Sequence, residues 1–243
     1  MMKHSLMARV LARLTLAAAV CSLLALSAGP AWAQDTAPTD RPFILPFLAP
    51  PGPDTWLLGQ TYGNTVGAYF NRKTTYQFSQ GIHFGIDLSA PCGTEVVAVA
   101  DGVVALVDAR AYGSLPHNLI IDHPQLGYAS LYGHLLRKPD LVAGQQVKAG
   151  QVVALSGDPD ETCDGRPHLH LEIRDYPGRA WKYNPIPLMQ ADWDNLALVG
   201  SFRTGFERDL DDPRKWQQLD DQPPAVSGGR LLNDFARPWP RVR

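Results

Sequence analysis

The stretch PHLHLE, residues 167–172, places two histidines one residue apart between leucines. On an extended strand successive side chains point to opposite faces, so His168 and His170 share one face while Leu169 and Leu171 share the other. Two imidazoles on one strand face suggest a metal site or an acid/base pair. Taken alone, the pattern also fits an ordinary half-exposed strand.

Short runs rich in β-branched and aromatic residues surround this stretch, from about Trp56 to Tyr183. Turn residues separate the runs, and none has a sustained 3.6-residue period. We therefore expect a mainly β domain built on an antiparallel sheet, with Asp101-Gly102 as the turn of a hairpin. The runs are GIHFGIDLSA (81–90), EVVAVA (95–100), GVVALVD (102–108), NLIIDH (118–123), YASLYGHL (128–135), QVVALSG (151–157) and HLHLEIR (168–174).

The first 33 residues have the build of a secretory signal peptide. Lys3, Arg9 and Arg13 precede an apolar run over 14–26, and Ala31-Trp32-Ala33 offers small residues at the two positions that a signal peptidase reads. The run is short for a membrane span, although an uncleaved N-terminal anchor is the alternative. We expect an exported chain, in the periplasm or outside the cell, without a transmembrane span.

Three further regions follow. Residues 34–55 are rich in proline and predict an irregular linker or arm, which could cover a binding groove. Residues 56–187 hold the β-rich runs and form the expected domain. Residues 188–243 change to mixed charge with short apolar runs, and we expect an irregular C-terminal extension of unknown role.

Composition and charge exclude some classes of protein. The 243 residues are 45% hydrophobic and 19% charged, which is ordinary for a globular domain. The expected signal peptide contains three of the 22 basic residues and none of the 24 acidic ones, so the rest of the chain carries five net negative charges. This balance gives no basic footprint for nucleic acid, and we expect no such partner.

Cys92 and Cys163 are the only cysteines after the expected signal peptide. An exported chain meets an oxidising compartment, so one disulfide between them is the natural expectation. Two separate buried thiols are the alternative, because the bridge requires the Cα atoms to lie within about 7 Å of each other.

Six of the seven histidines lie between positions 83 and 170. In GIHFGID, His83 and Asp87 are four residues apart, and even spacing on a strand puts both on one side, with Gly85 between them leaving room for an ion. Two histidine nitrogens and a carboxylate oxygen are a typical ligand set for catalytic zinc, and His170 would complete it. His83 and Asp87 alone could be a surface ion pair, but the combination with the HLH stretch favours a metal site.

These motifs resemble those of the LytM and lysostaphin-type zinc metallopeptidases, which cut peptide bonds in bacterial peptidoglycan. The resemblance rests on HxxxD at His83 and Asp87, YGHL around His134, and HLH at 168–170. Connecting phrases such as NLIIDH and VKAGQVVALSGD follow in the family's order. The resemblance spans roughly residues 60–185.

The resemblance implies an antiparallel β domain of the duplicated-hybrid-motif type with an open groove. One Zn²⁺ would be held at its floor by His83, Asp87 and His170, with His134 and His168 as the catalytic residues. Zinc lowers the pKa of a bound water and polarises a carbonyl, and a neighbouring imidazole can take the proton. We expect His168 to act as general base and His134 to stabilise the oxyanion, although the two roles could be exchanged.

Weaker candidates lie around these motifs. Asn64, Arg72 and Tyr132 are candidates for substrate binding, with Tyr132 expected to pack beside the site. Glu172 could orient a ligand from behind the metal. The family usually has glycine and small hydroxyl residues before HxH, whereas residues 158–166 here are acidic, which we expect to alter substrate preference.

His117 and His123 stay outside this assignment. His123 ends a predicted strand and is expected to be structural. His117 follows Pro116 in a predicted loop and receives no role.

Other functions remain as rivals. A non-catalytic relative could activate another wall hydrolase, or a zinc endopeptidase could act on a protein outside the wall. A lipoyl-type carrier would need a lysine at the turn that Asp101-Gly102 occupies, and a cupin would place its glutamate further along than Glu172. The peptide bond that is cut and the oligomeric state are not readable from the sequence.

Overall fold

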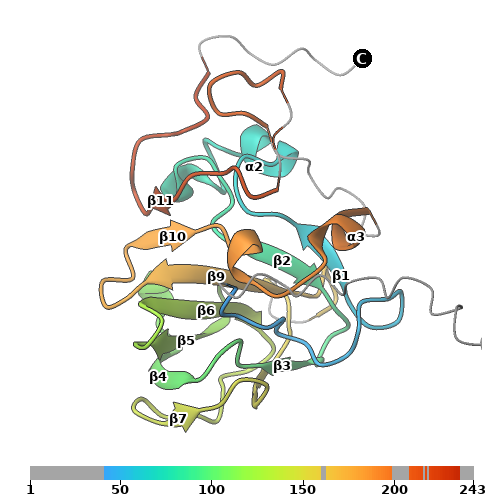
Figure 1. Ribbon diagram of the computed structural model, residues 1–243, viewed down its shortest axis with the longest axis vertical. Coiled ribbons are helices and arrows are strands. Elements are labelled where there is room, and N and C mark those ends of the chain that lie inside the picture. Colours follow the sequence, from blue (N-terminus) through green and yellow to red (C-terminus); the bar gives the residue numbers. More distant parts are fainter. Residues whose placement is uncertain (1–40, 160–162, 199–207, 216, 218, 236–243) are drawn as a thin grey trace, which may run out of the picture. The chain divides into compact units, whose positions relative to one another are not determined.

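The computed structural model describes residues 41–159, 163–198, 208–215, 217 and 219–235. The expected signal peptide and residues 34–40 of the arm lie outside these ranges. The described fold is mainly antiparallel β with few short helices, as the sequence predicts (Figure 1). Among the described residues no helix has both the length and the apolar character needed to cross a membrane.

A nine-stranded sheet dominates the described residues, in the order β1-β2-β9-β6-β5-β4-β7, with β10 pairing both β9 and β11. β9 is its central strand, because β6 pairs it on one edge while β2 and then β10 share the other. The strands are β1 (Leu57–Gln60), β2 (Ile86–Ser89), β4 (Gly102–Val107), β5 (His117–His123), β6 (Tyr128–Leu135), β7 (Gln146–Val147), β9 (His168–Asp175), β10 (Trp181–Tyr183) and β11 (Ala225–Val226).

The hairpin expected at Asp101-Gly102 is wrong. β3 (Glu95–Val97) pairs with β8 (Val152–Leu155) in a separate two-stranded sheet, and the chain then crosses to β4 in the large sheet. The backbone at Gly102 does not adopt the left-handed conformation. A Cβ there would lie 2.4 Å from the carbonyl oxygen of Asp122, so glycine allows a close approach of strands rather than a tight turn.

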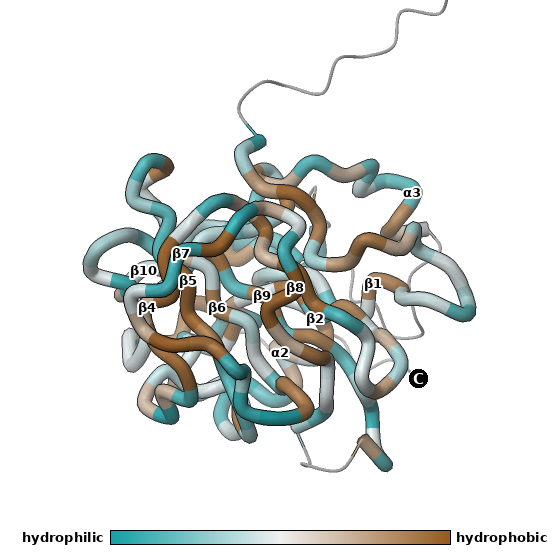
Figure 2. Tube along the Cα trace, turned by 90° about the horizontal axis from the view of Figure 1, so that it is seen from below, coloured by the Kyte–Doolittle hydropathy of each residue, from teal (hydrophilic) through white to brown (hydrophobic). Residues whose placement is uncertain are grey.

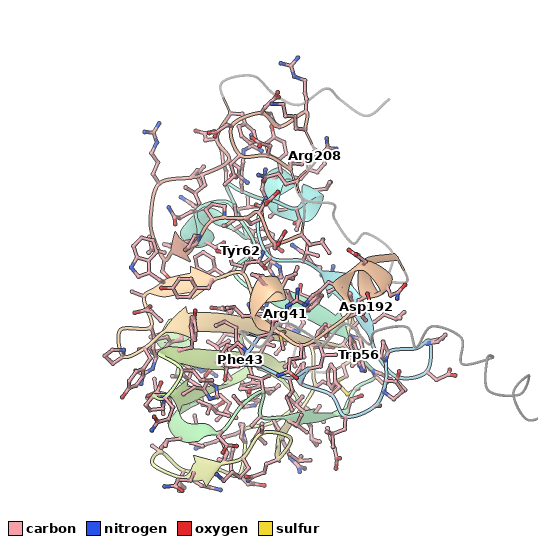
Figure 3. All side chains as sticks on the ribbon, viewed as in Figure 1. Arg41, Phe43, Trp56, Tyr62, Asp192 and Arg208 are labelled. Atoms are coloured by element: carbon pink, nitrogen blue, oxygen red, sulfur yellow. A yellow bond between two sulfur atoms is a disulfide. The ribbon has the colours of Figure 1, made fainter. Side chains whose placement is uncertain are left out.

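One face of the large sheet forms the main core. Leu169 and Leu171 of β9 point into it, and Figure 2 shows the apolar residues concentrated in the central strands. Phe43, labelled in Figure 3, is fully buried there and forms a bridge with Met189. Helix α3 (Trp193–Leu198) adds Trp193 to the same core. Residues on both sides of the expected domain, 56–187, therefore contribute to its core.

The opposite face carries His168, His170, Glu172 and Arg174 of β9, and we call it the histidine face. Residues 108–116, with the 3₁₀ helix η2 (Arg110–Tyr112), cover part of it over β5 and β6. Helix α2 (Val66–Phe70) and the 3₁₀ helix η1 (Gln77–Ser79) belong to the segment that leads to His83.

C-terminal residues brace that segment. The backbone N–H of Asn64 donates to the Gln222 side chain at 2.8 Å, and the Asn233 side chain donates to the Gly81 carbonyl. The Tyr62 hydroxyl lies 2.9 Å from the carbonyl oxygen of Pro223 (Figure 3). The C-terminal extension therefore belongs to the folded unit over its described residues.

Candidate metal centre

His83 lies just before a strand rather than within it. β2 begins at Ile86, and His83 is held by a bridge to Gly63 with N···O distances of 2.8 and 2.9 Å. The expectation of one continuous strand through His83 and Asp87 is thus wrong, yet their side chains meet, with His83 Nε2 3.2 Å from Asp87 Oδ1. A Cβ on Gly85 would lie 2.3 Å from the Leu171 carbonyl oxygen, so this glycine allows close contact with β9.

His170 joins this pair through strand register. It lies directly opposite Asp87 on β2 and Gly133 on β6. Its Nδ1 is 2.8 Å from Asp87 Oδ1 and 3.1 Å from His83 Nε2. The ligand atoms that the three residues offer all lie within 4.8 Å of one another. The ligand atoms of a tetrahedral zinc ion lie about 3.4 Å apart. A small increase in the distances between these three atoms would therefore allow zinc to bind.

Hydrogen bonds fix the tautomers of the imidazoles. His83 Nδ1 is 2.8 Å from the Thr61 carbonyl oxygen, which can only accept, so the proton lies on Nδ1 and Nε2 is free. His170 Nε2 lies 3.1 Å from a Glu172 carboxylate oxygen and donates to it. Nε2 of His83 and Nδ1 of His170 are therefore the nitrogens turned toward Asp87. In the metal-free chain His170 Nδ1 carries a proton and donates to Asp87 at 2.8 Å, and a metal ion would replace that proton. Such outer hydrogen bonds orient histidines that bind metals.

This arrangement attracts a positive charge. Burial alone would raise the pKa of Asp87, but His83 and His170 hold it well below its usual range. Burial would lower the pKa of His170, but the hydrogen bonds to Asp87 and Glu172 outweigh it and raise the pKa to about 9. A proton or a metal ion at Nδ1 would satisfy the converging acceptors, and the two nitrogens and one oxygen suit zinc.

Glu172 and Arg174 support His170 from behind. Arg174 Nε donates to the second Glu172 oxygen at 2.8 Å, and both residues are 3% exposed. Burial would raise the pKa of Glu172, but Arg174 and His170 lower it to about 2, so the carboxylate is charged.

A β-bulge places His134 on the histidine face. Three residues of β6, 133–135, advance the chain where β5 advances two, and His134 has a φ of 55°. Regular alternation would turn its side chain toward the core beside Tyr132. Instead its ring centroid lies 4.9 Å from that of His168 and 5.7 Å from that of His170. Left-handed backbone is uncommon outside glycine and often marks a functional position.

Both extra histidines present Nε2 as the free nitrogen. His134 Nδ1 donates to the Leu115 carbonyl and His168 Nδ1 donates to the Arg166 carbonyl, the latter at 2.7 Å. His168 Nε2 lies 3.9 Å from Asp87 Oδ1, beside the ligand cluster. Burial and the neighbouring His170 lower the pKa of His134 to about 4, so this imidazole is neutral near pH 7.

A disulfide lies close to this centre. Cys92, three residues after β2, bonds to Cys163, five residues before β9, with Cα atoms 5.6 Å apart. The expected bridge is confirmed. It ties the loop that precedes His168 to the end of the strand that carries Asp87.

Tyr132 does not lie beside the site. Its ring is fully buried in the main core, and its hydroxyl accepts from the Val99 amide at 2.8 Å and from Ser130 at 3.2 Å. His123 extends this buried network, with Nε2 2.8 Å from Ser130 Oγ. A substrate on the histidine face cannot contact Tyr132, so the expectation of substrate binding is wrong for it.

The two other weak candidates also have local partners. Asn64 is fully buried, and its Oδ1 accepts from Asn233 at 2.8 Å. Arg72 donates to the Tyr69 carbonyl at 2.7 Å and stacks on the Tyr69 ring. Among the contacts of the described residues, neither side chain reaches the metal centre.

His117 begins β5 instead of lying in a loop. Its Nδ1 lies 2.9 Å from Asp108 Oδ2, a local hydrogen bond. The groups that sequence reasoning missed are the carbonyls of Thr61, Leu115 and Arg166, because a backbone acceptor leaves no signal in residue type.

Comparisons with known proteins agree with this geometry. Residues 81–185 match the model of Peptidase family M23. The murein hydrolase activator EnvC of Escherichia coli (strain K12) is 42% identical over 92 residues, which are 37% of this chain and 20% of that protein. The peptidoglycan DD-endopeptidase ShyB of Vibrio cholerae serotype O1 is 34% identical over 128 residues, 51% of this chain and 26% of that protein. This chain thus spans about a fifth to a quarter of these two relatives.

A solved structure of a zinc-containing peptidase from Vibrio cholerae is 27% identical, with a TM-score of 0.44, covering 63% of this chain and 41% of that chain. The matched residues, 81–185, include His83, Asp87, His134, His168 and His170. Residues 81–185 are therefore similar to Peptidase family M23, in agreement with the LytM and lysostaphin type that the motifs of the sequence resemble.

Proposed function

We propose that the chain is a zinc metalloendopeptidase that hydrolyses peptide bonds in bacterial cell-wall peptidoglycan. One observation carries the proposal: His83, Asp87 and His170 turn three acceptor atoms toward one point, and the rings of His134 and His168 lie beside it. A protein that only stores metal does not need two further imidazoles that are not metal ligands beside the site. Such imidazoles suit proton transfer.

His83 Nε2, Asp87 Oδ1 and His170 Nδ1 would hold one zinc ion. When bound, zinc supplies a Lewis acid that acidifies water and polarises the scissile carbonyl. Thr61 and Glu172 keep the two ligating imidazoles in the required tautomers.

The two other histidines would handle the protons. His134 is neutral and has its proton on Nδ1, so its Nε2 can accept a proton but cannot donate one. We therefore assign the general base to His134. His168, when protonated at Nε2, would donate to the oxyanion or to the leaving amine. This assignment exchanges the roles expected from the sequence.

The names of the relatives support the substrate class. ShyB is a peptidoglycan DD-endopeptidase and EnvC is a murein hydrolase activator, and both are similar to this chain over the domain. The leader-like residues 1–33 support export to the cell envelope. The division into 1–33, 34–55, 56–187 and 188–243 stays a proposal, with the folded unit reaching beyond 56–187.

A non-catalytic activator is the second candidate, because EnvC carries that name. Such a chain would not need two free imidazoles beside a complete ligand set. A peptidase acting on a protein outside the wall would share the same centre and differ only in substrate.

The test is mass spectrometry of fragments released from purified peptidoglycan by the zinc-loaded chain. New peptide termini that disappear with His134→Ala, while zinc content is unchanged, would support the peptidase and name the bond. An intact peptidoglycan with a zinc-loaded, folded chain would contradict it. Stimulation of a separate wall hydrolase would then point to an activator.

A further inference from the structure

A cavity lies on the histidine face at the far end of β9 from His168. It has a volume of about 250 Å³, and its lining includes Tyr112, Arg174, Arg179, Lys182 and Ser227. Lys182 on β10 is directly opposite Arg174, so both side chains belong to the same face as His170 and Glu172. The metal centre and this cavity therefore share one strand face.

The three cations of the lining differ in their partners. Arg174 is paired with Glu172, and Arg179 with Asp122. Lys182 is 2% exposed, and its ammonium donates to the Ala180 carbonyl at 2.9 Å and to Ser227 Oγ at 2.6 Å. Within the described part of the chain, no carboxylate lies within salt-bridge distance of Lys182, and the third side of its ammonium faces the Phe84 ring, 4.8 Å from the ring centroid.

Buried lysines are rare unless they are paired, because an uncompensated charge is costly away from water. Arg174 uses only two of its five N–H donors, on Glu172 and on the Tyr112 carbonyl, within the described contacts. Two buried cations thus line one cavity, and Arg174 has further N–H donors there besides the two that are used. Such a set matches the acceptor oxygens of an anion.

We propose that this cavity binds a carboxylate of the peptide substrate through Lys182, Arg174 and Ser227. The proposal rests on the proposed function, because a peptide bears carboxylates at its end and on acidic side chains. Four residues separate Arg174 from His170 along β9, which is about 13 Å. A carboxylate bound in the cavity would therefore lie at about this distance from the metal centre, and the substrate would pass over the buried Glu172 rather than contact it.

The titration of Lys182 agrees with this role. Burial and the neighbouring Arg174 lower the pKa of Lys182 to about 8, and the more distant carboxylates of Glu172 and Asp175 only partly offset this. A bound carboxylate would raise the pKa again.

Direct binding is tested by NMR of the full chain with ¹³C-labelled lysine, following the Lys182 ε-carbon, which the spectrum of Lys182→Met assigns. N-acetylalanine should move this signal saturably, with N-acetylalaninamide at least tenfold weaker. Lys148→Met, at an exposed ion pair with Asp101, is the matched control and should leave the response intact. No response to N-acetylalanine, or a response only to inorganic phosphate, would overturn the proposal.

Cleavage is tested on peptidoglycan before and after its carboxylates are amidated with carbodiimide and ammonia. The unmodified chain should lose about tenfold in kcat/KM on the amidated material. Lys182→Met should be about tenfold slower on untreated material and lose nothing further on amidation. Equal rates of both proteins on both materials would overturn the proposal.

Failure of the proposed function and failure of the cavity proposal can be distinguished. If neither material is cleaved, the proposed function fails while the NMR experiment still decides whether the cavity takes a carboxylate. If Lys182→Met does not fold, Ser227→Ala should show a smaller loss in the same direction, and no loss would count against the proposal.

Discussion

Replacing Glu172 by glutamine tests whether a buried carboxylate positions the metal ligand His170. Glu172 accepts from His170 Nε2 at 3.1 Å and from Arg174 Nε at 2.8 Å, so it restrains the imidazole and neutralises a buried guanidinium. Glutamine keeps the shape but removes the charge. Loss of such an outer partner costs about 10–100-fold in metal affinity, or about 1.4–2.7 kcal/mol.

Zinc affinity should be measured by competition with a chelator at fixed pH, alongside urea unfolding of the metal-free chain. We expect weaker zinc binding and an unfolding free energy lower by about 1–3 kcal/mol, because Arg174 loses its counterion. Glu95→Gln, at an exposed position of β3, is the matched control. A zinc affinity within twofold of the unmodified chain would refute the positioning role of Glu172.

Three further predictions concern the surroundings of the centre. Replacing Cys92 and Cys163 together by alanine should lower the free energy of unfolding by about 2–4 kcal/mol in urea, because a loop of 71 residues is released; an unchanged midpoint would contradict this. Tyr132→Phe should cost about 1–3 kcal/mol, since two buried donors lose their acceptor, yet leave kcat/KM within about threefold; a large loss of activity at normal zinc content would return Tyr132 to the site. In the metal-free chain, the contribution of Glu172 to folding stability is present above pH 4.5 and is lost as the pH falls toward 2. The contribution of His170 is present below pH 6.5 and is lost as the pH rises through 9. The urea concentration at the unfolding midpoint should therefore be highest between about pH 4.5 and 6.5. A maximum at pH 9 would contradict the assignment.

The strand pattern of the domain could be predicted from the sequence, because short runs rich in β-branched and aromatic residues, bounded by turn residues, mark β5, β6 and β9 directly. Alternation also put His168 and His170 on one face. Which strands pair with each other could be predicted less well. Asp101-Gly102 has the composition of a hairpin turn, but the chain uses Gly102 for a close approach to Asp122 and changes sheets there.

In the metal centre, too, local sequence patterns did not predict bulges or strand register. Even spacing predicts that Tyr132 and His134 share a face, and the bulge in β6 separates them, with Tyr132 in the core and His134 beside His168. The register that sets Asp87 opposite His170 depends on the packing of distant segments. Lys182 had no signal at all, because a lysine near a strand end is usually solvated.

The most direct test of the central claim is a crystal structure of the zinc-loaded chain with anomalous data at the zinc edge. The account predicts one peak, about 2.0–2.2 Å from His83 Nε2, Asp87 Oδ1 and His170 Nδ1, with the Nε2 atoms of His134 and His168 nearby but outside the coordination sphere. Zinc bound through His134 or His168 instead, or no peak at this position, would contradict it.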